Sequence, residues 1–308
     1  MSHHNKPRYR TTNWKQYNAA LKARGSLSIW LDKRMAWFAA NSGKRGRSPK
    51  FSDAAIQFCL TLKNLFSLAL RQTTGLVESV LQLCGLAWPV PDFSTLCRRQ
   101  RDVNVQIPYS RSKEGLHLLV DSTGIKFLGE GEWKCKKHDA EYRRQWRKLH
   151  IGIDAGTLQI RAICVTSNNV SDASVLGDLL EQLPPDEALK SLTGDGAYDT
   201  QPAHEAVLRH GAIPIIPPRK NARVRKGTVF EHRNAAIAAC RRLGRSIWKR
   251  WIGYHRRSLV ETKMNCIKRL GERVMSRTFE RQVNELHIRA AILNRFTELG
   301  RPQTAAVA

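Results

Sequence analysis

LHLLVDSTGIKFL, at residues 116–128, is a β-rich run that carries an aspartate, Asp121, directly after the apolar residues HLLV. Two further β-rich runs follow at close spacing, RKLHIGIDAG at 147–156 and LQIRAICVTSN at 158–168. Short β-rich runs separated by turn residues are typical of an antiparallel meander. We therefore expect three sequential strands, with Asp121 at the end of the first buried run, where an unpaired charge is costly.

The chain then alternates between helical and extended patterns. SDASVLGDLLEQL at 171–183 is amphipathic, and SLTGDGAYD at 191–199 is a short strand that enters a glycine turn. QPAHEAVLRHG at 201–211 predicts a helix that ends at its glycine, and AIPIIPP at 212–218 a strand stopped by prolines. The predicted order of elements from residue 116 to residue 218 is therefore three strands, a helix, a strand, a helix and a strand.

Two acids end the predicted strands. Asp195 lies between Gly194 and Gly196, which permit close approach of a ligand or of backbone. Together with Asp121 it could bind a hard cation such as Mg²⁺, which takes one or two protein carboxylates and completes its shell with water and phosphate. A single aspartate at a strand end is also a common turn former, and Asp154, in IGIDAGT, illustrates that alternative.

The first 107 residues have helical patterns. Ser52 is a plausible N-cap, the Thr-Thr-Gly sequence at 73–75 predicts a break, and Asp92 or Ser94 could cap another helix. Several short helices with basic ends resemble a helix-turn-helix region, and an all-helical dimerisation module is the alternative. The predicted DNA-contacting residues of this region are Lys44, Arg45, Arg47, Lys50, Arg98, Arg99 and Arg101.

The charge of the chain indicates a polyanionic partner. The 308 residues include 52 Lys and Arg against 26 Asp and Glu, so the net charge is +26 and the pI is near 10.4. Nucleic acid is the first candidate for such a partner. A membrane is not expected, because no apolar run approaches the roughly 18 residues that span a bilayer. The seven scattered cysteines indicate a reduced, cytoplasmic protein, and CKKH at 135–138 lacks a second pair of metal ligands.

The stretch YHRRSLVETKMNCIK, at residues 254–268, contains a single acidic residue, Glu261, among several Lys and Arg residues. On a helix, Tyr254, Arg257, Glu261 and Lys268 fall within an arc of about 60°, beside an apolar stripe. A polyanion lying along this arc, with Glu261 holding metal at its centre, is one interpretation. A solvated face and a structural Arg257–Glu261 pair are the alternatives.

These residues resemble a known family. The spacing Y-(2)-R-(3)-E-(6)-K is the signature of a large group of DDE transposases from bacterial insertion sequences, and Asp121 and Asp195 resemble that group's first and second acids. The resemblance covers nearly the whole chain, including the N-terminal stretch at 43–75. Only 261 − 195 = 66 residues separate the last two acids. Residues 219–247 are therefore expected to form a short basic connector instead of the large β-rich insertion of some relatives.

The resemblance implies an α+β fold, in which a helical DNA-end-binding region at 1–107 precedes an RNase H-like catalytic domain at 108–299. This domain is expected to be a mixed sheet flanked by helices. From its composition, GRPQTAAVA at residues 300–308 is expected to be a disordered tail. The resemblance further implies two Mg²⁺ ions, replaceable by Mn²⁺, on Asp121, Asp195 and Glu261, with Tyr254, Arg257 and Lys268 at DNA phosphates. The partners it implies are double-stranded DNA, both transposon ends and target, and a second copy of the chain on that DNA. The expected location is the bacterial cytoplasm, at the nucleoid.

Two other classes of protein remain as alternatives. A tyrosine recombinase would use Tyr254 as its nucleophile, but would need an Arg and His constellation upstream and no strand-end acids. A non-catalytic DNA-binding protein, such as a decayed transposase, accounts for the charge but leaves the three acids without a role.

Overall fold

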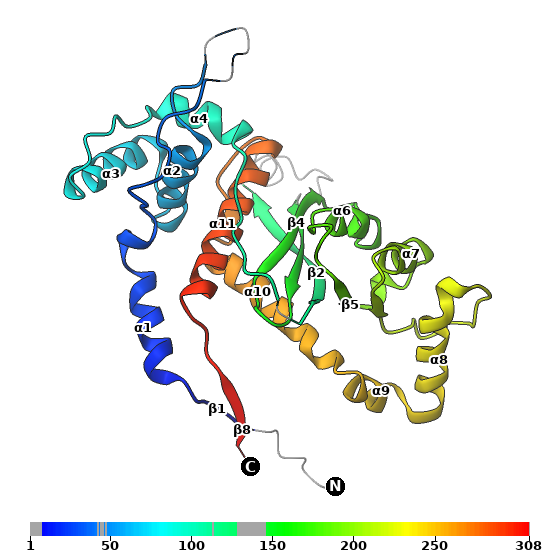
Figure 1. Cartoon of the computed structure of the whole chain (residues 1–308). Helices are drawn as coiled ribbons and strands as arrows, with labels where there is room; N and C mark the ends of the chain where they lie inside the picture. The colour runs from blue at the N-terminus through cyan, green and yellow to red at the C-terminus, as the bar shows by residue number, and fades with distance from the viewer. Residues whose placement is uncertain are drawn as a thin grey trace, which may run out of the picture.

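The computed structural model describes residues 8–41, 43, 46, 48–112, 114–127 and 146–307 (Figure 1). A group of N-terminal helices comes before the main β-sheet in the chain, and later helices pack on both faces of that sheet. In chain order the elements are β1 (Arg8–Thr11), α1 (Trp14–Arg24), α2 (Asp53–Leu65), α3 (Leu70–Leu83), α4 (Phe93–Asp102), β2 (Leu116–Phe127), β3 (Trp146–Asp154), β4 (Ile160–Ser167), α6 (Leu176–Leu180), β5 (Leu189–Thr193), α7 (Gln201–Arg209), β6 (Ile213–Ile215), α8 (Glu231–Leu243), α9 (Arg245–Trp251), α10 (Ser258–Arg269), β7 (Arg273–Val274), α11 (Phe279–Leu299) and β8 (Thr304–Val307).

The main sheet is mixed and has the strand order β4-β3-β2-β5-β6, with β7 pairing the far end of β2. Strands β2, β3 and β4 form an antiparallel meander, which confirms the pattern predicted for the first three strands. Strands β5 and β6 join in parallel, as the intervening helices require. The predicted order of strands and helices after residue 115 is therefore confirmed, and β7 is a short strand that the sequence did not indicate.

Helices bury both faces of this sheet. On one face, Leu119, Ile125 and Ile151 pack with residues of α10 and α11. On the other face, Leu118 and Val120 pack with residues of α6 and α7. Residues of β2 thus alternate between two apolar layers, as the two-residue period of a strand dictates. Figure 1 shows α10 and α11 on one side of the strands and α6 and α7 on the other.

The turn between β3 and β4 is built by Asp154. Its carboxylate accepts hydrogen bonds from the backbone N–H groups of Gly156, at 2.8 Å, and Thr157, at 3.2 Å. The Thr157 hydroxyl adds a third, at 2.8 Å. The interpretation of Asp154 as a turn former is confirmed.

The N-terminal region is largely helical, as predicted. Ser52 caps α2, since its Oγ accepts a hydrogen bond from the N–H of Ala55 at 3.1 Å. The predicted break at 73–75 is wrong, because α3 runs through it. Thr73 and Thr74 donate their hydroxyls to the carbonyls four residues earlier, at 2.9 and 3.0 Å, and so remain compatible with a helix.

Helix α11 is shared by the two halves of the chain. Its residues Ile288 and Ile292 belong to the core of the N-terminal helices, whereas Leu286 and Leu293 belong to the core of the sheet. A fragment ending near residue 107 would leave the first of these surfaces open to water.

Residues 300–307 include a strand, contrary to the expectation of a disordered tail at 300–308. Residues Thr304–Val307 form β8, which pairs antiparallel with β1. Backbone hydrogen bonding explains the difference, because each of the two termini supplies the other with a partner strand that the local sequence does not reveal.

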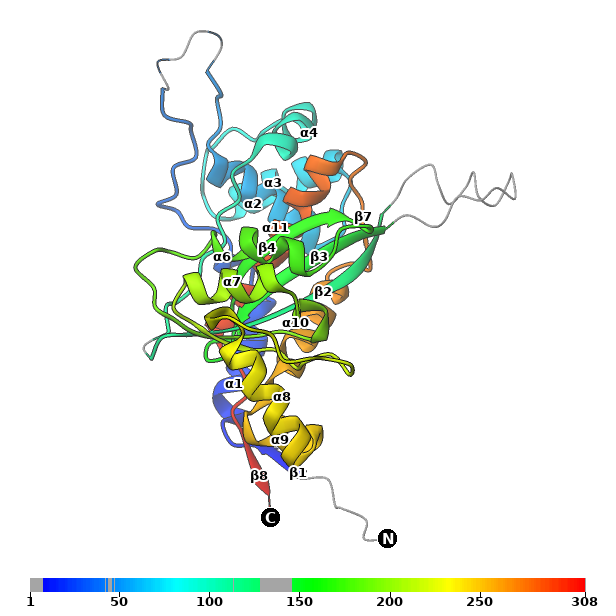
Figure 2. The same ribbon diagram turned by 90° about the vertical axis from the view of Figure 1, so that its right-hand side faces the viewer.

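The predicted basic connector is helical. Residues 219–251, here called the basic arm, contain α8 and α9, which lie to the side of the sheet near β6 and α7 (Figures 1 and 2). Phe230 and Trp248 of the arm are buried. The arm then leads through a 3₁₀ turn, Tyr254–Arg257, into α10.

Candidate active site

The register of the sheet brings the first two acids together. Strands β2 and β5 are parallel, with Leu119 opposite Thr193. Asp121 and Asp195 each lie two residues further along, where β5 has ended. Asp121 is inside β2 and not at its end, which corrects the expected position, because β2 continues along β3 as far as residue 126.

The third acid comes from the helix over the same face. Asp121 has the parity of Leu119 in β2, and Leu119 packs in the core that contains α10. Val260, Met264 and Ile267 form the buried stripe of α10, as predicted, and Glu261 lies beside that stripe in the first turn. The helix starts at Ser258, so Tyr254 and Arg257 belong to the preceding 3₁₀ turn.

Arg257 connects two of the acids. One guanidinium nitrogen, Nη1, donates to Oδ2 of Asp121 and the other, Nη2, donates to Oε1 of Glu261. The Arg257 side chain is 20% exposed, Asp121 16% and Glu261 53%. The pairing of Arg257 with Glu261 was one of the alternatives for this helix, but the bond to Asp121 was not anticipated.

The electrostatics at Asp121 show a shortage of positive charge. Burial raises the pKa of Asp121, and the nearby Asp195 carboxylate raises it further. The N–H of Ser122, at 2.8 Å from Oδ1, and the Arg257 guanidinium act in the opposite direction without cancelling these effects. Asp195 accepts one hydrogen bond, from the N–H of Ala197 at 2.8 Å. A buried carboxylate whose pKa is raised, with a second carboxylate beside it, suits a cation.

The donor set fits a hard divalent ion, since carboxylate oxygens are the ligands that Mg²⁺ and Mn²⁺ favour. Among the described residues, however, no group of three His, Cys, Asp or Glu lies close enough to hold a metal as it stands. Arg257 lies between Asp121 and Glu261 and takes up one oxygen of each. A shared ion would therefore need Arg257 to move and Glu261, which is half exposed, to turn inward.

The other two members of the spaced motif differ in their surroundings. The Tyr254 ring is partly buried, 6.0 Å from the Arg257 guanidinium carbon and 4.9 Å from Nζ of Lys249. Burial raises the pKa of its hydroxyl, which is therefore protonated. Lys268 lies in the last turn of α10, roughly 10 Å from Glu261 along the axis. It has no ion-pair partner in the part of the chain that the structure describes.

The glycines around Asp195 have a packing role. A Cβ at Gly194 would lie 2.8 Å from Cδ2 of Tyr198 and 3.2 Å from Cγ2 of Val120. The close approach anticipated for this turn is thus, at Gly194, an approach of Tyr198, which is fully buried.

The predicted DNA contacts of the helical region are only partly described. Lys44, Arg45 and Arg47 lie outside the described residues, as does the CKKH sequence. Arg99 has a structural role, because it pairs with Asp53 at 2.5 Å and donates to the Phe51 carbonyl at 2.9 Å. Arg101 contacts its neighbour Asp102 at 2.9 Å. Lys50 and Arg98 are exposed at the surface.

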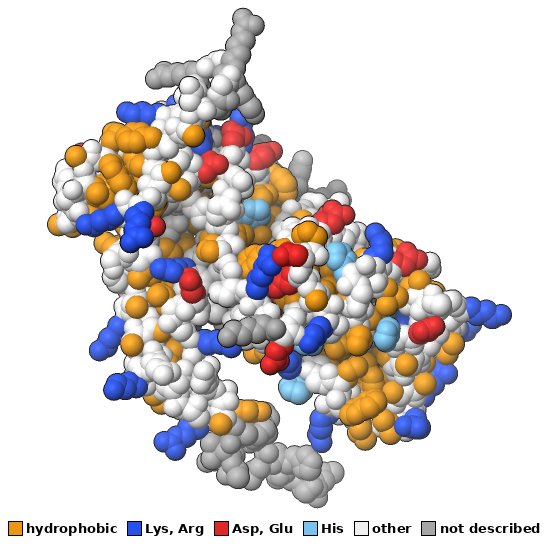
Figure 3. All heavy atoms as spheres, viewed as in Figure 1, with side chains coloured by type: hydrophobic (Ala, Val, Ile, Leu, Met, Phe, Trp, Pro, Cys, Tyr) orange, Lys and Arg blue, Asp and Glu red, His pale blue; other side chains and the backbone are white. Residues whose placement is uncertain are grey.

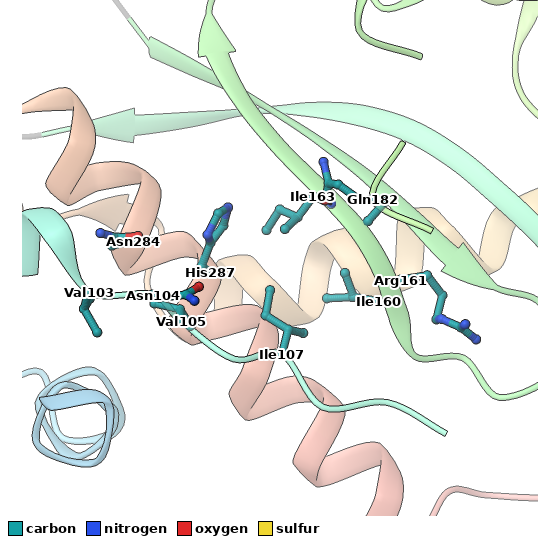
Figure 4. A pocket seen from close by; sticks show the side chains of 11 residues that line it. Val103, Asn104, Val105, Ile107, Ile160, Arg161, Ile163, Gln182, Asn284 and His287 are labelled. Atoms are coloured by element: carbon teal, nitrogen blue, oxygen red, sulfur yellow. Dashed lines mark hydrogen bonds between the residues drawn. The ribbon is translucent and has the colours of Figure 1, made fainter. Parts of the chain in front are cut away.

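A groove of about 460 Å³ lies elsewhere, between residues 103–107, β4 and α11 (Figure 4). His287 of α11 faces it, and burial lowers the pKa of His287 to about 4. None of the three acids lines this groove, so it is not part of the site.

The basic arm presents a cationic surface next to the site. Figure 3 shows blue Lys and Arg side chains around orange hydrophobic ones where α8 and α9 lie. Ile247 and Trp251, one helical turn apart, are 57% and 76% exposed. No helix in the described ranges is long and apolar enough to cross a membrane.

Comparison with protein families decides the identity of this arrangement. A family model described as a transposase DDE domain matches residues 112–295, and a second one with the same description matches residues 22–130. The chain is a member of the DDE transposase family. The mixed sheet with helices on both faces is compatible with the RNase H-like domain of these transposases.

Two polar clusters of this transposase were missed in the sequence. Asp199 binds Arg233, 34 positions away, at 2.6 Å. Asp172 forms an ion pair with Lys148, 2.9 Å between Oδ1 and Nζ, on the face of the sheet opposite Asp121. Neither cluster has a local spacing signal, because the partners meet only after the strands and helices have assembled.

Proposed function

We propose that this transposase binds the terminal inverted repeats of an insertion sequence, cleaves at its ends and joins the 3′-hydroxyls to target DNA. The observation that carries the proposal is that Asp121 lies beside Asp195 in the sheet and is joined to Glu261 through Arg257, next to a strongly basic arm. Family membership supports transposition as the reaction.

Asp121, Asp195 and Glu261 would hold two divalent ions, Mg²⁺ or Mn²⁺, which when bound activate the attacking oxygen and neutralise the leaving one. Water first breaks the phosphodiester bond at the element's end and leaves a 3′-hydroxyl. That hydroxyl then attacks a phosphodiester of target DNA, whose own 3′-oxygen leaves. One bond forms and one breaks in each step, without a covalent link to protein.

The cations of the motif would act on the phosphates. In this proposal Arg257 exchanges its two carboxylates for a phosphate of the cleaved strand, which it can grip with two parallel hydrogen bonds. Lys268 would contact a phosphate further along α10, and Tyr254 would pack beside it. Lys50 and Arg98, together with Lys44, Arg45 and Arg47, would contribute to binding of the ends. Two ends must meet, so a homodimer on DNA is part of the proposal.

The test is nicking of DNA that carries the element's own ends, which the inverted repeats flanking the gene would identify. With Mg²⁺ the protein should nick these ends, leave 3′-hydroxyls and form no adduct on denaturing gels. A protein adduct that Tyr254→Phe abolishes would instead identify a tyrosine recombinase. Tight end binding without cleavage in Mg²⁺ or Mn²⁺ would identify a non-catalytic DNA-binding protein.

A further inference from the structure

A buried ion pair links the loop of the second acid to the basic arm. Asp199 follows Asp195 by four residues, and its side chain is 1% exposed. Arg233 of α8 donates Nε to its Oδ1 at 2.6 Å and Nη2 to its Oδ2 at 3.4 Å. Arg233 is the buried one among the eleven Lys and Arg of the arm. Its charge is therefore turned inward, toward the sheet, while most of the others face solvent.

The same carboxylate also holds other segments. The N–H of Arg219, where the arm begins, donates to Asp199 Oδ2 at 3.0 Å. His204 of α7 places Nε2 at 3.3 Å from Oδ1. Arg233 donates its remaining nitrogen, Nη1, to the carbonyl of Arg223 at 2.8 Å. Asp199 thereby connects α7, the start of the arm and α8.

The loop between Asp195 and Asp199 is a single tight turn. The N–H of Ala197 bonds the Asp195 carboxylate at 2.8 Å, and that of Tyr198 bonds the Asp195 carbonyl at 3.2 Å. The N–H of Asp199 bonds the Gly196 carbonyl at 3.3 Å, which also receives Nε of Arg219 at 3.4 Å. A turn closed by this many short-range bonds transmits a displacement of Asp199 to Asp195.

The charge on Asp199 is maintained in the folded protein. Burial opposes ionisation, but hydrogen bonds from His204 and Arg233 outweigh it, so the pKa of Asp199 is well below its ordinary value. An ion pair that is buried on both sides is costly to break from one side, because the remaining charge stays out of water without a partner.

We propose that Asp199 is a positioning residue that fixes the basic arm to the loop of Asp195. The second acid and the cations of the arm then keep one relative position. The catalytic consequence rests on the proposed function, since it matters only if Asp195 acts on DNA that the arm contacts. The mechanical link itself does not depend on that function.

The mechanical link is tested by hydrogen exchange on the full-length protein. Asp199→Asn keeps the shape and removes the charge, Arg233→Met removes the partner, and Asp186→Asn, which breaks an exposed pair with Arg111, is the matched control. We expect exchange to become on the order of 100-fold faster both in 219–233 and in 194–199, from the usual effect of breaking a buried pair. Asp186→Asn should change neither segment.

Three further results decide the inference. The double variant Asp199→Asn/Arg233→Met should exchange no faster than either single variant, because both remove one link. Arg233→Lys keeps the charge and should show a smaller effect, which guards against a variant that simply fails to fold. Faster exchange in 219–233 with 194–199 unchanged would overturn the proposal, since the arm would then be anchored independently of Asp195.

A catalytic measurement separates this inference from the proposed function. Asp199→Asn should lower the single-turnover rate of end cleavage at least about 10-fold and change end affinity less than about 3-fold, because most arm cations are untouched. If the wild-type protein cleaves nothing, the proposed function fails and the exchange data alone judge the link. If the wild type cleaves and Asp199→Asn cleaves equally fast, the positioning role is refuted.

Discussion

Replacing Arg257 by methionine should make the free protein less stable and more responsive to divalent metal. The guanidinium makes two charge-assisted bonds, which are worth roughly 1.5–3 kcal/mol each when buried and under about 1 kcal/mol when exposed. The bond to Asp121 is largely buried and the one to Glu261 is not. The expected loss in unfolding free energy is therefore about 2–3 kcal/mol, which lowers Tm by roughly 3–5 °C in a chain of this length.

Divalent metal should stabilise Arg257→Met more strongly than it stabilises the wild type. In the wild type a divalent ion must displace Arg257 from both carboxylates, whereas in Arg257→Met the acids are free and under-neutralised. The apparent affinity for Mn²⁺ without DNA should thus be about 10- to 100-fold higher in the variant, because each 1.4 kcal/mol corresponds to a factor of ten. The assay is Tm as a function of Mn²⁺ concentration, supported by titration of free Mn²⁺.

Arg256→Met is the matched control, because Arg256 is the adjacent arginine and donates to the Ala155 carbonyl at 3.1 Å, away from the acids. It should leave the Mn²⁺ response unchanged. An equal Mn²⁺-induced rise in Tm for wild type and Arg257→Met would refute the reasoning, since Arg257 would then not occupy the place of the ion.

Three other predictions concern single cations. Burial lowers the pKa of Lys263 to about 8, so the folded protein holds this proton less tightly than the unfolded chain does. The wild type therefore gains stability as the pH rises from about 8 to 10.5. Lys263→Met should be more stable than the wild type by roughly 3 kcal/mol at pH 7, and the difference in Tm between the two should shrink over that pH range. Lys268→Ala should lower strand transfer about 10-fold with little change in Tm, and an unchanged transfer rate would exclude a phosphate contact. Arg99→Ala should lower Tm through its bond to Asp53, whereas Arg98→Ala should lower only end affinity, by up to about 10-fold and more steeply at low salt; the opposite pattern in melting and gel-shift assays would contradict the structure.

The main features of the sheet could be predicted because they are encoded locally. Period-two and period-3.6 patterns, together with Gly and Pro stops, predicted the order of elements between residues 116 and 218. The N-cap at Ser52 predicted the start of α2. Local signals were misleading at 73–75, where Thr side chains satisfied by helix carbonyls allow α3 to continue. The prediction of a disordered tail failed for a different reason. Strand β8 forms only through pairing with β1, some 290 residues earlier in the chain.

The nearness of several candidate side chains was predictable, but their contacts with one another were not. Spacing placed Arg257 and Glu261 within reach of each other, and the strand order suggested that Asp121 and Asp195 would meet. The bond from Arg257 to Asp121 spans 136 positions, and the pair of Asp199 with Arg233 depends on how the arm folds back on the sheet. Contacts of that kind follow from tertiary packing and leave no periodic trace in the sequence.

The central claim is that Asp121, Asp195 and Glu261 act together as one metal-dependent site. It is tested most directly by single-turnover cleavage of an end fragment in Mg²⁺ by Asp121→Asn, Asp195→Asn and Glu261→Gln, with Asp186→Asn as an exposed control. Each site variant keeps its shape but loses a charged ligand, so cleavage should fall by at least about 1,000-fold while gel-shift affinity for the same fragment stays within about 3-fold. Cleavage within about 10-fold of wild type by any one of the three would contradict the account and remove that residue from the site.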